Sequence, residues 1–193
     1  MNKIQFLNEL KKEVEKCQRC PLYKTRTKVV FGTGSVDAKL IIISEAPGHW
    51  EDQRGEPFVG AAGKVLNELL ESIEIKREDI FIANILKCRP PENRNPQAEE
   101  IEVCTPYLER QIEIIKPKVI CTLGNYSTKY ILEKYGLGNQ VQGISKIHGE
   151  IFEVKSLFEN IKIIPLYHPA VATYNANMKE TLKKDFKILE QFK

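Results

Sequence analysis

Short apolar runs alternate along this chain with segments that place apolar residues at helical spacing. The apolar runs are rich in isoleucine and valine and predict buried strands at residues 39–44, 80–86, 119–123 and 161–166. The helical spacing predicts helices at residues 64–75, 98–116, 125–135 and 178–192. Because strands that alternate with helices form parallel sheets covered on both faces, we expect an α/β fold. Its centre is a mostly parallel, four-stranded sheet flanked by helices on both faces.

The remaining segments have weaker patterns. Residues 1–16 place apolar residues at helical spacing and predict an amphipathic helix. Residues 32–35 contain half of a dinucleotide-binding fingerprint, but they precede a strand instead of following one, so we interpret them as a turn. Residues 141–154 predict a hairpin or an extended loop. No repeat, linker or low-complexity tract interrupts the chain, which predicts one domain over residues 1–193.

The longest irregular segment, residues 45–63, follows the first predicted strand. We expect a loop of about 20 residues without secondary structure of its own, and loops of that length are usually functional. Ligands of α/β sheets bind at the carboxyl ends of the strands, where this loop begins. Asn84, Asn125 and His168 lie at or after the ends of the other predicted strands. Parallel strands would therefore bring these side chains and Glu45 to one edge of the sheet.

Bulk composition constrains the location of the protein more than its substrate. The net charge of +3 is too small to indicate a polyanionic partner by itself, and 42% hydrophobic residues are ordinary for a globular protein. Residues 1–16 contain neither a signal-peptide core nor an apolar run that could span a bilayer, which predicts a cytoplasmic location. In a reducing compartment, five cysteines indicate metal ligation or redox chemistry in preference to disulfides.

Four of the cysteines have a spacing typical of ligands to one metal centre. Cys17 and Cys20 form a Cys-x-x-Cys pair, and Cys88 and Cys104 follow the second predicted strand. Four thiolates suit zinc or an iron–sulfur cluster, and the spacing alone leaves both open. The expected role is structural, because the site would tie the N-terminal segment to the loop after the second strand. Cys121 lies inside a predicted strand, where we expect a small buried hydrophobe.

Three motifs and these four cysteines resemble the family 4 uracil-DNA glycosylases, the thermostable iron–sulfur type. The first motif, over residues 45–63, is Glu-Ala-Pro-Gly-x-x-Glu-Asp-x-x-Gly-x-Pro-Phe-Val-Gly-x-Ala-Gly. The second, over residues 83–91, is Ala-Asn-Ile-Leu-Lys-Cys-Arg-Pro-Pro, and the third, over residues 167–170, is Tyr-His-Pro-Ala. The resemblance covers nearly the whole chain and implies a uracil-DNA glycosylase-like fold. Ser44 stands where the family usually has glycine, and we expect this position to act through its backbone.

The resemblance implies a monofunctional enzyme that flips uracil out of DNA and hydrolyses its N-glycosidic bond to deoxyribose. The abasic product would start base-excision repair. A [4Fe-4S] cluster is also implied, with the ligands Cys17, Cys20, Cys88 and Cys104. The implied uracil-binding residues are Glu45, Ala46, Pro47, Gly48, Glu51, Phe58, Asn84 and His168. The expected partner is single- or double-stranded DNA that contains uracil. We expect a monomer, and the chain has no secure motif for binding a sliding clamp.

Each implied role has a chemical reason. Phe58 would stack on the uracil ring. Asn84 offers an acceptor and donors that match N3–H and O4 of uracil, whereas cytosine presents the opposite pattern. Glu51 would help to close the side of the pocket that the methyl group of thymine would enter. His168 would donate a hydrogen bond to O2 of the departing uracil anion, together with backbone N–H groups of residues 45–48.

The group that activates the water is left open. Related glycosylases of the first family place an aspartate at the position of Ala46, and alanine can do no acid–base work. Either Glu45 or Glu51 assists the water, or the cation-like sugar captures a water that is merely positioned. The implied catalytic residues are therefore His168, Glu45 and Glu51.

Two further predictions concern contacts with DNA. Lys87, Arg89 and Arg94 are candidate phosphate contacts, and residues 170–174 are a candidate wedge that fills the gap left by a flipped base.

Two alternative functions are considered. One alternative is a non-catalytic iron–sulfur or zinc protein that binds nucleic acid. Another is a nucleotide hydrolase, although the chain contains no phosphate-binding loop of the Walker type.

Overall fold

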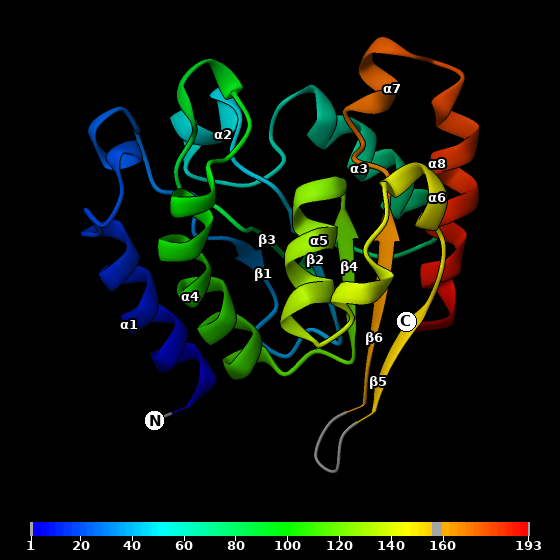
Figure 1. Ribbon diagram of the computed structural model, residues 1–193, viewed down its shortest axis with the longest axis horizontal. Coiled ribbons are helices and arrows are strands. Elements are labelled where there is room, and N and C mark those ends of the chain that lie inside the picture. Colours follow the sequence, from blue (N-terminus) through cyan, green and yellow to red (C-terminus); the bar gives the residue numbers. More distant parts are fainter. Residues whose placement is uncertain (1, 156–159, 193) are drawn as a thin grey trace.

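The computed structural model of the protein describes residues 2–155 and 160–192 and is built on a six-stranded mixed sheet in the order β1-β3-β2-β4-β6-β5 (Figure 1). The strands are β1 (Thr33–Gly34), β2 (Leu40–Ser44), β3 (Phe81–Asn84), β4 (Val119–Leu123), β5 (Phe152–Lys155) and β6 (Asn160–Leu166). The central strands β3, β2, β4 and β6 are parallel to one another. The edge strands β1 and β5 run antiparallel to their neighbours. The predicted α/β class and the four-stranded parallel centre are confirmed, and the two edge strands are additional.

Helices cover both faces of the sheet, as predicted. One face carries α1 (Lys3–Glu15), α4 (Ala98–Ile115), α5 (Asn125–Lys134) and α6 (Ile144–Ile147). The other face carries α3 (Ala61–Ser72), α7 (Val171–Tyr174) and α8 (Met178–Phe186). The short helix α2 (His49–Arg54) follows β2. Short 3-10 segments lie at Pro21–Lys24, Arg77–Asp79, Pro91–Asn93, Gly138–Gln140 and Lys187–Phe192.

The central strands separate two hydrophobic cores. In β2, Ile41 and Ile43 pack into the core beneath α1, α4 and α5, whereas Leu40 and Ile42 pack into the core beneath α3 and α8. Every residue of β2 and of β4 is buried. A strand that is buried on both faces needs a continuous apolar run, and that is the pattern from which these strands were predicted.

The connecting segments differ most from expectation. Residues 45–63 are not a structureless loop, because α2 and the beginning of α3 lie within them. Residues 33–34 are not part of a turn but form the edge strand β1, which pairs with β3. Residues 141–154 contain α6 and the first residues of β5. A helix of four to six residues is too short for its periodicity to be recognised in a sequence.

Helix boundaries also moved, and α3 spans Ala61–Ser72 instead of residues 64–75. The first helix begins at Lys3, because the Asn2 side chain caps it by accepting a hydrogen bond from the backbone N–H of Gln5 at 3.0 Å. Residue 1 of the predicted helix lies outside the described residues. The last predicted helix, residues 178–192, divides into α8 and a 3-10 segment.

The parallel strands bring their carboxyl ends to one end of the molecule. In Figure 1 the arrowheads of β4 and β6 point to the end where α2 and α7 lie. Ser44 and Asn84 are register partners in β2 and β3, and Leu123 pairs with Leu166 in β4 and β6. His168 follows β6 by two residues and therefore belongs to the same end. Within residues 2–155 and 160–192, no helix is long and apolar enough to cross a membrane.

Candidate active site

A cavity of about 370 Å³ opens at the carboxyl ends of β2 and β3, beside the segment that follows β6. All the residues that the resemblance implied for uracil line it: Glu45, Ala46, Pro47, Gly48, Glu51, Phe58, Asn84 and His168. The rest of its wall is formed by Ser44, Ala62, Pro90, Asn93, Arg94 and Ala170. The fold therefore assembles one concave site from three distant segments of the chain.

His168 presents a neutral imidazole to this cavity. Its Nδ1 accepts a hydrogen bond from the backbone N–H of Ala170 at 3.1 Å. A backbone amide can only donate, so in the neutral ring the proton is on Nε2. Burial lowers the pKa of His168 to about 4, although the nearby carboxylate of Glu51 acts in the opposite direction. The ring is therefore an uncharged hydrogen-bond donor near neutral pH.

Ser44 contributes its side chain to the site, so the expectation that it acts only through its backbone is wrong. Its Oγ lies 3.0 Å from Nε2 of His168. Because Nε2 carries the proton, the serine oxygen is the acceptor in this contact. A glycine at this position would leave Nε2 without that partner.

Phe58 forms one wall and is held in a strained backbone conformation. Its ring stacks on the His168 imidazole, with ring centroids 5.5 Å apart and an interplanar angle of 25°. Its φ of 54° lies in the left-handed region, which is costly for a bulky residue. Arg77, which no motif marks, stabilises this conformation by donating to the carbonyl oxygen of Phe58 at 3.0 Å and to that of Pro57. Gly63 provides the space, because a Cβ there would lie 2.0 Å from the Phe58 oxygen.

Asn84 ends β3 with its side chain directed at the cavity. The residue is only 2% exposed, yet its amide has no hydrogen bond to any other residue that the structure describes. No fully buried polar side-chain atom of those residues lacks a partner, so the amide group must reach the cavity surface. An unpaired donor and acceptor in a concave site is available for a ligand.

Lys87 is not available to DNA, and its predicted phosphate contact is wrong. It is 1% exposed, and its Nζ donates to the carbonyl oxygen of Asn84 at 2.9 Å and to Oε1 of Gln111 at 2.7 Å. Burial lowers the pKa of this amine to about 8. Lys87 therefore fixes the backbone of Asn84 from beneath the cavity.

The two candidate acids are held differently. Oε1 of Glu51 accepts hydrogen bonds from the backbone N–H groups of Val59 and Gly60, each at 2.9 Å. Glu45 is half-buried, and its carboxylate makes no hydrogen bond to another residue of the described chain. Burial raises the pKa of Glu45. Glu51 is thus anchored to the loop, whereas the Glu45 carboxylate is unpaired among the described residues.

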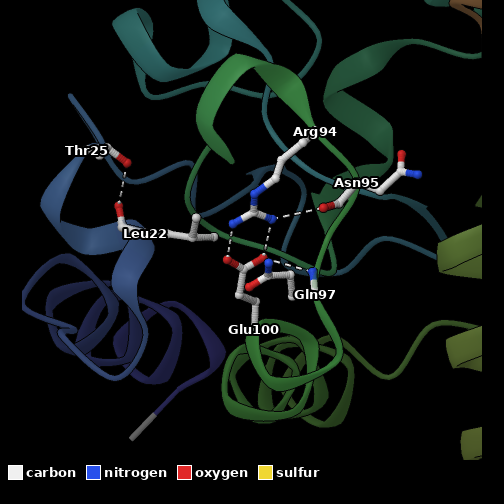
Figure 2. A network of polar contacts seen from close by, with 6 residues as sticks. All are labelled: Leu22, Thr25, Arg94, Asn95, Gln97 and Glu100. Atoms are coloured by element: carbon white, nitrogen blue, oxygen red, sulfur yellow. Dashed lines mark hydrogen bonds and ion pairs between the residues drawn. The ribbon is translucent and has the colours of Figure 1, made fainter.

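The guanidinium of Arg94 is partly exposed but is engaged by other residues of the protein (Figure 2). It forms a two-pronged pair with the buried Glu100, with distances of 3.0 and 2.6 Å, and also donates to the carbonyl oxygen of Asn95. These bonds from Arg94 hold the pKa of the Glu100 carboxyl below its usual value. The backbone N–H of Gln97 donates to the same carboxylate at the start of α4. Arg94 therefore shapes the cavity wall, and its predicted phosphate contact stays a prediction.

The predicted wedge, residues 170–174, begins at the cavity wall. Ala170 lines the cavity, and the following four residues form α7. Tyr174 is 77% exposed at the end of this short helix. The side chain that projects from this segment is therefore Tyr174, and its role as a wedge stays a prediction.

The four predicted cysteine ligands line a second cavity, at the end of α1. Cys17 and Cys20 are partly buried, and Cys88 and Cys104 are buried. Within the described residues, no three histidine, cysteine or acidic side chains are grouped so that they could hold a single metal ion. Cys121 is fully buried in the other core, in agreement with its prediction as a small hydrophobe.

The groups around these four thiols would stabilise negative charge on their sulfur atoms. Arg26 donates from Nη1 to the sulfur of Cys88 at 3.3 Å, and the backbone N–H of Lys87 donates to the sulfur of Cys104 at 3.2 Å. Burial raises the pKa of Cys20 and Cys88, and raises that of Cys104 to about 12. Thiolates at such positions need positive charge among them, which a metal centre with four sulfur ligands supplies. The donors aimed at the sulfurs are those that outer-shell residues provide in such sites.

Comparison with known proteins identifies close relatives. The family model described as "Uracil DNA glycosylase superfamily" matches residues 31–191. A type-4 uracil-DNA glycosylase of Sulfurisphaera tokodaii is 45% identical over 189 residues, which cover 97% of this chain and 85% of the relative. Another from Archaeoglobus fulgidus is 44% identical over 184 residues, covering 95% of this chain and 92% of the relative. A third, from Thermotoga maritima, is 40% identical over 171 residues, covering 89% and 85% respectively.

Proposed function

The chain belongs to the type-4 uracil-DNA glycosylases of the uracil-DNA glycosylase superfamily, and we propose that Phe58, Asn84 and His168 bind and release uracil in it. The enzyme hydrolyses the N-glycosidic bond between uracil and deoxyribose in DNA. This assignment rests on one observation: Phe58, Asn84 and His168 come from three different motifs and line one cavity. The base must leave the DNA stack to enter such a cavity, at a cost of a few kcal/mol.

Uracil is selected by hydrogen bonding and by shape. The Phe58 ring provides a stacking face, and the unpaired amide of Asn84 pairs with N3–H and O4 of uracil. Cytosine presents the opposite pattern at these two positions and would leave the buried amide unpaired, which is costly. Glu51, anchored by two backbone N–H groups, limits the space for the methyl group of thymine.

His168 stabilises the leaving group. As the bond breaks, negative charge develops on O2 of uracil, and Nε2–H of a neutral imidazole donates to it. The backbone bond from Ala170 to Nδ1 supports this role, because it fixes the tautomer before the reaction starts. Preorganised donors of this kind commonly supply the largest single part of the rate enhancement.

Glu45 is the better candidate to activate the water. Its carboxylate lines the cavity and is not engaged by another described residue, whereas Glu51 is used to hold the backbone of the loop. A half-buried carboxylate with a raised pKa is a stronger base than an exposed one. Glu45 therefore takes a proton from the water that attacks the anomeric carbon.

Cys17, Cys20, Cys88 and Cys104 hold a [4Fe-4S] cluster in this proposal, and its role is structural. When bound, the cluster cross-links the end of α1 to the loop after β3 and to α4. Hydrolysis of a glycosidic bond needs no electron transfer, so the cluster supports the cavity only through the backbone around Lys87.

An end-labelled oligonucleotide with one deoxyuridine tests the proposal. The intact protein should make it cleavable by alkali at the uracil only, and oligonucleotides with thymine or cytosine at that position should remain whole. His168→Ala should reduce the rate strongly, whereas His148→Ala, which removes a histidine outside the cavity, should retain it. Absence of cleavage by protein with its full iron content would instead support the alternative of a non-catalytic nucleic-acid-binding protein.

A further inference from the structure

Trp50 is exposed beside the cavity, where no proposed role uses it. It is the only tryptophan in the chain and is 58% exposed. It lies in α2 between Gly48 and Glu51, both of which line the cavity. Its indole offers a large apolar face with a polar N–H, which a ligand beside the cavity could cover.

The indole is fixed against the cavity wall. A Cβ placed on Gly60 would lie 3.4 Å from Cδ1 of Trp50, so the ring lies directly along the backbone of Gly60. The N–H of Gly60 in turn donates to Glu51, whose carboxylate lines the cavity. Trp50 therefore packs on Gly60, which is hydrogen-bonded to a residue that lines the cavity.

Two further side chains continue from the indole along the rim. The His49 ring meets Trp50 edge-on, with centroids 5.0 Å apart, and Nη1 of Arg89 lies 3.3 Å from Nδ1 of His49. Arginine can only donate, so Nδ1 accepts and a neutral His49 carries its proton on Nε2. Nε of Arg89 also donates to Asn93, which lines the cavity. We call Trp50, His49 and Arg89 the Trp50 strip.

The Trp50 strip has the chemistry of a single-strand subsite. It combines an exposed aromatic face with the guanidinium of Arg89, which has no ion pair with an acidic residue anywhere in the described chain. Proteins bind single-stranded nucleic acid by stacking bases on aromatic rings while cations follow the phosphates. A base that remains paired in a duplex cannot reach an indole in this way, whereas an unpaired base can.

We propose that the Trp50 strip binds the nucleotide adjoining the flipped uridine, with its base stacked on Trp50 and its phosphate on Arg89, and so favours uracil in single-stranded DNA. The proposal rests on the proposed function, since it assumes that a nucleotide chain enters the cavity. Stacking on an aromatic ring tolerates any base, so the subsite selects the form of the DNA and not the neighbouring sequence.

Fluorescence of the single tryptophan gives a direct test. The probe is an unlabelled, single-stranded oligonucleotide with one 2′-fluorodeoxyuridine, whose fluorine slows loss of the base. Its addition should quench the emission of Trp50 to saturation, and the matching duplex should quench it less. An unchanged emission, under conditions where the anisotropy of a labelled copy reports full binding, would overturn the proposal.

Substitutions then separate stacking from general binding. Trp50→Ala should weaken binding of the single strand by about tenfold or more and that of the duplex much less, and Trp50→Phe should restore part of the difference. Arg89→Ala should reduce the slope of log binding constant against log salt concentration for the single strand by somewhat less than one. Phe6→Ala, which removes another exposed aromatic ring on α1, and Arg110→Ala on α4 are the matched controls and should change neither property.

Uracil release by the same proteins distinguishes failure of this proposal from failure of the proposed function. If wild type releases uracil but Trp50→Ala keeps the same ratio of single-strand to duplex affinity, the subsite is wrong and the glycosylase function stands. If wild type with full iron content releases no uracil from either form of DNA, the proposed function fails and the subsite falls with it.

Discussion

The Ser44 hydroxyl oxygen lies 3.0 Å from Nε2 of His168, and this contact joins residues that are 124 positions apart in the chain. The imidazole is held at both nitrogens, by Ser44 on one side and by the backbone N–H of Ala170 on the other. Nε2–H therefore points at the Ser44 oxygen in the cavity wall, and O2 of a uracil bound beside that oxygen can share this donor. A glycine at position 44 would have no side chain to make the first of these two contacts.

Removing the hydroxyl should slow the reaction. One hydrogen bond of this kind contributes about 1 kcal/mol, so Ser44→Ala should lower kcat by roughly fivefold, with little change in KM. The measurement is the single-turnover rate of uracil release. Ser44→Thr, which keeps a hydroxyl, should retain more of the rate than Ser44→Ala, and an Ala variant faster than wild type would contradict the positioning role.

The lowered pKa of His168 should make the folded protein sensitive to mild acid. Its pKa is lowered from 6.5 to about 4, so between these values the unfolded chain binds a proton that the folded chain does not. Stability should therefore rise with pH across this window and be lost as the pH falls through it. Urea unfolding of wild type and of His168→Gln at several pH values measures the contribution as their difference. A difference that does not vary with pH would show that the ring is not protected from protonation.

Gly63 should be intolerant of alanine although it lies within a helix. Alanine in place of glycine normally favours a helix by up to about 1 kcal/mol. Here the new Cβ would lie 2.0 Å from the carbonyl oxygen of Phe58, so the strained segment must move. Gly63→Ala should destabilise the protein by about 1–3 kcal/mol and weaken uracil binding.

A second glycine provides the control for that substitution. A Cβ on Gly138 would meet only the Glu133 side chain, at an ordinary distance of 3.7 Å. Gly138→Ala should therefore leave thermal unfolding and uracil binding nearly unchanged. If Gly63→Ala behaved in the same way, the close approach to Phe58 would not matter for the site.

The cysteine site can be tested by its iron content. Cys104→Ser should lose iron, acid-labile sulfide and the visible absorption of the cluster, and should unfold at a lower temperature, because the link between α1 and α4 is lost. Cys121→Ser changes a buried thiol in the other core and should keep the full iron content. Equal iron loss in both variants would mean that a folding defect, and not a missing ligand, is being measured.

The sequence predicted those features that depend on local pattern. The central strands follow from continuous apolar runs such as 119–123, and the convergence of Asn84 and His168 follows from parallel strands that share one edge. Lys87 was misjudged because it was grouped with the basic residues Arg89 and Arg94, whereas its place in the interior depends on the distant acceptor Gln111. Arg77 was missed for the same reason, since its role depends on carbonyl groups that a strained turn presents to it.

The two candidate bases should differ in their effect on the pH profile. The base must be ionised, and burial raises the pKa of Glu45. As the pH is lowered, the rate of uracil release should therefore begin to fall at a higher pH than an ordinary glutamate would cause. His168, with a pKa of about 4, titrates too low to cause this decline. Glu45→Gln should lower kcat by about 100-fold and abolish the acidic limb. Glu51→Gln should keep the limb and mainly lower stability, because a neutral amide oxygen accepts more weakly from Val59 and Gly60 than the carboxylate does. If the limb instead vanished in Glu51→Gln and persisted in Glu45→Gln, the base would be Glu51.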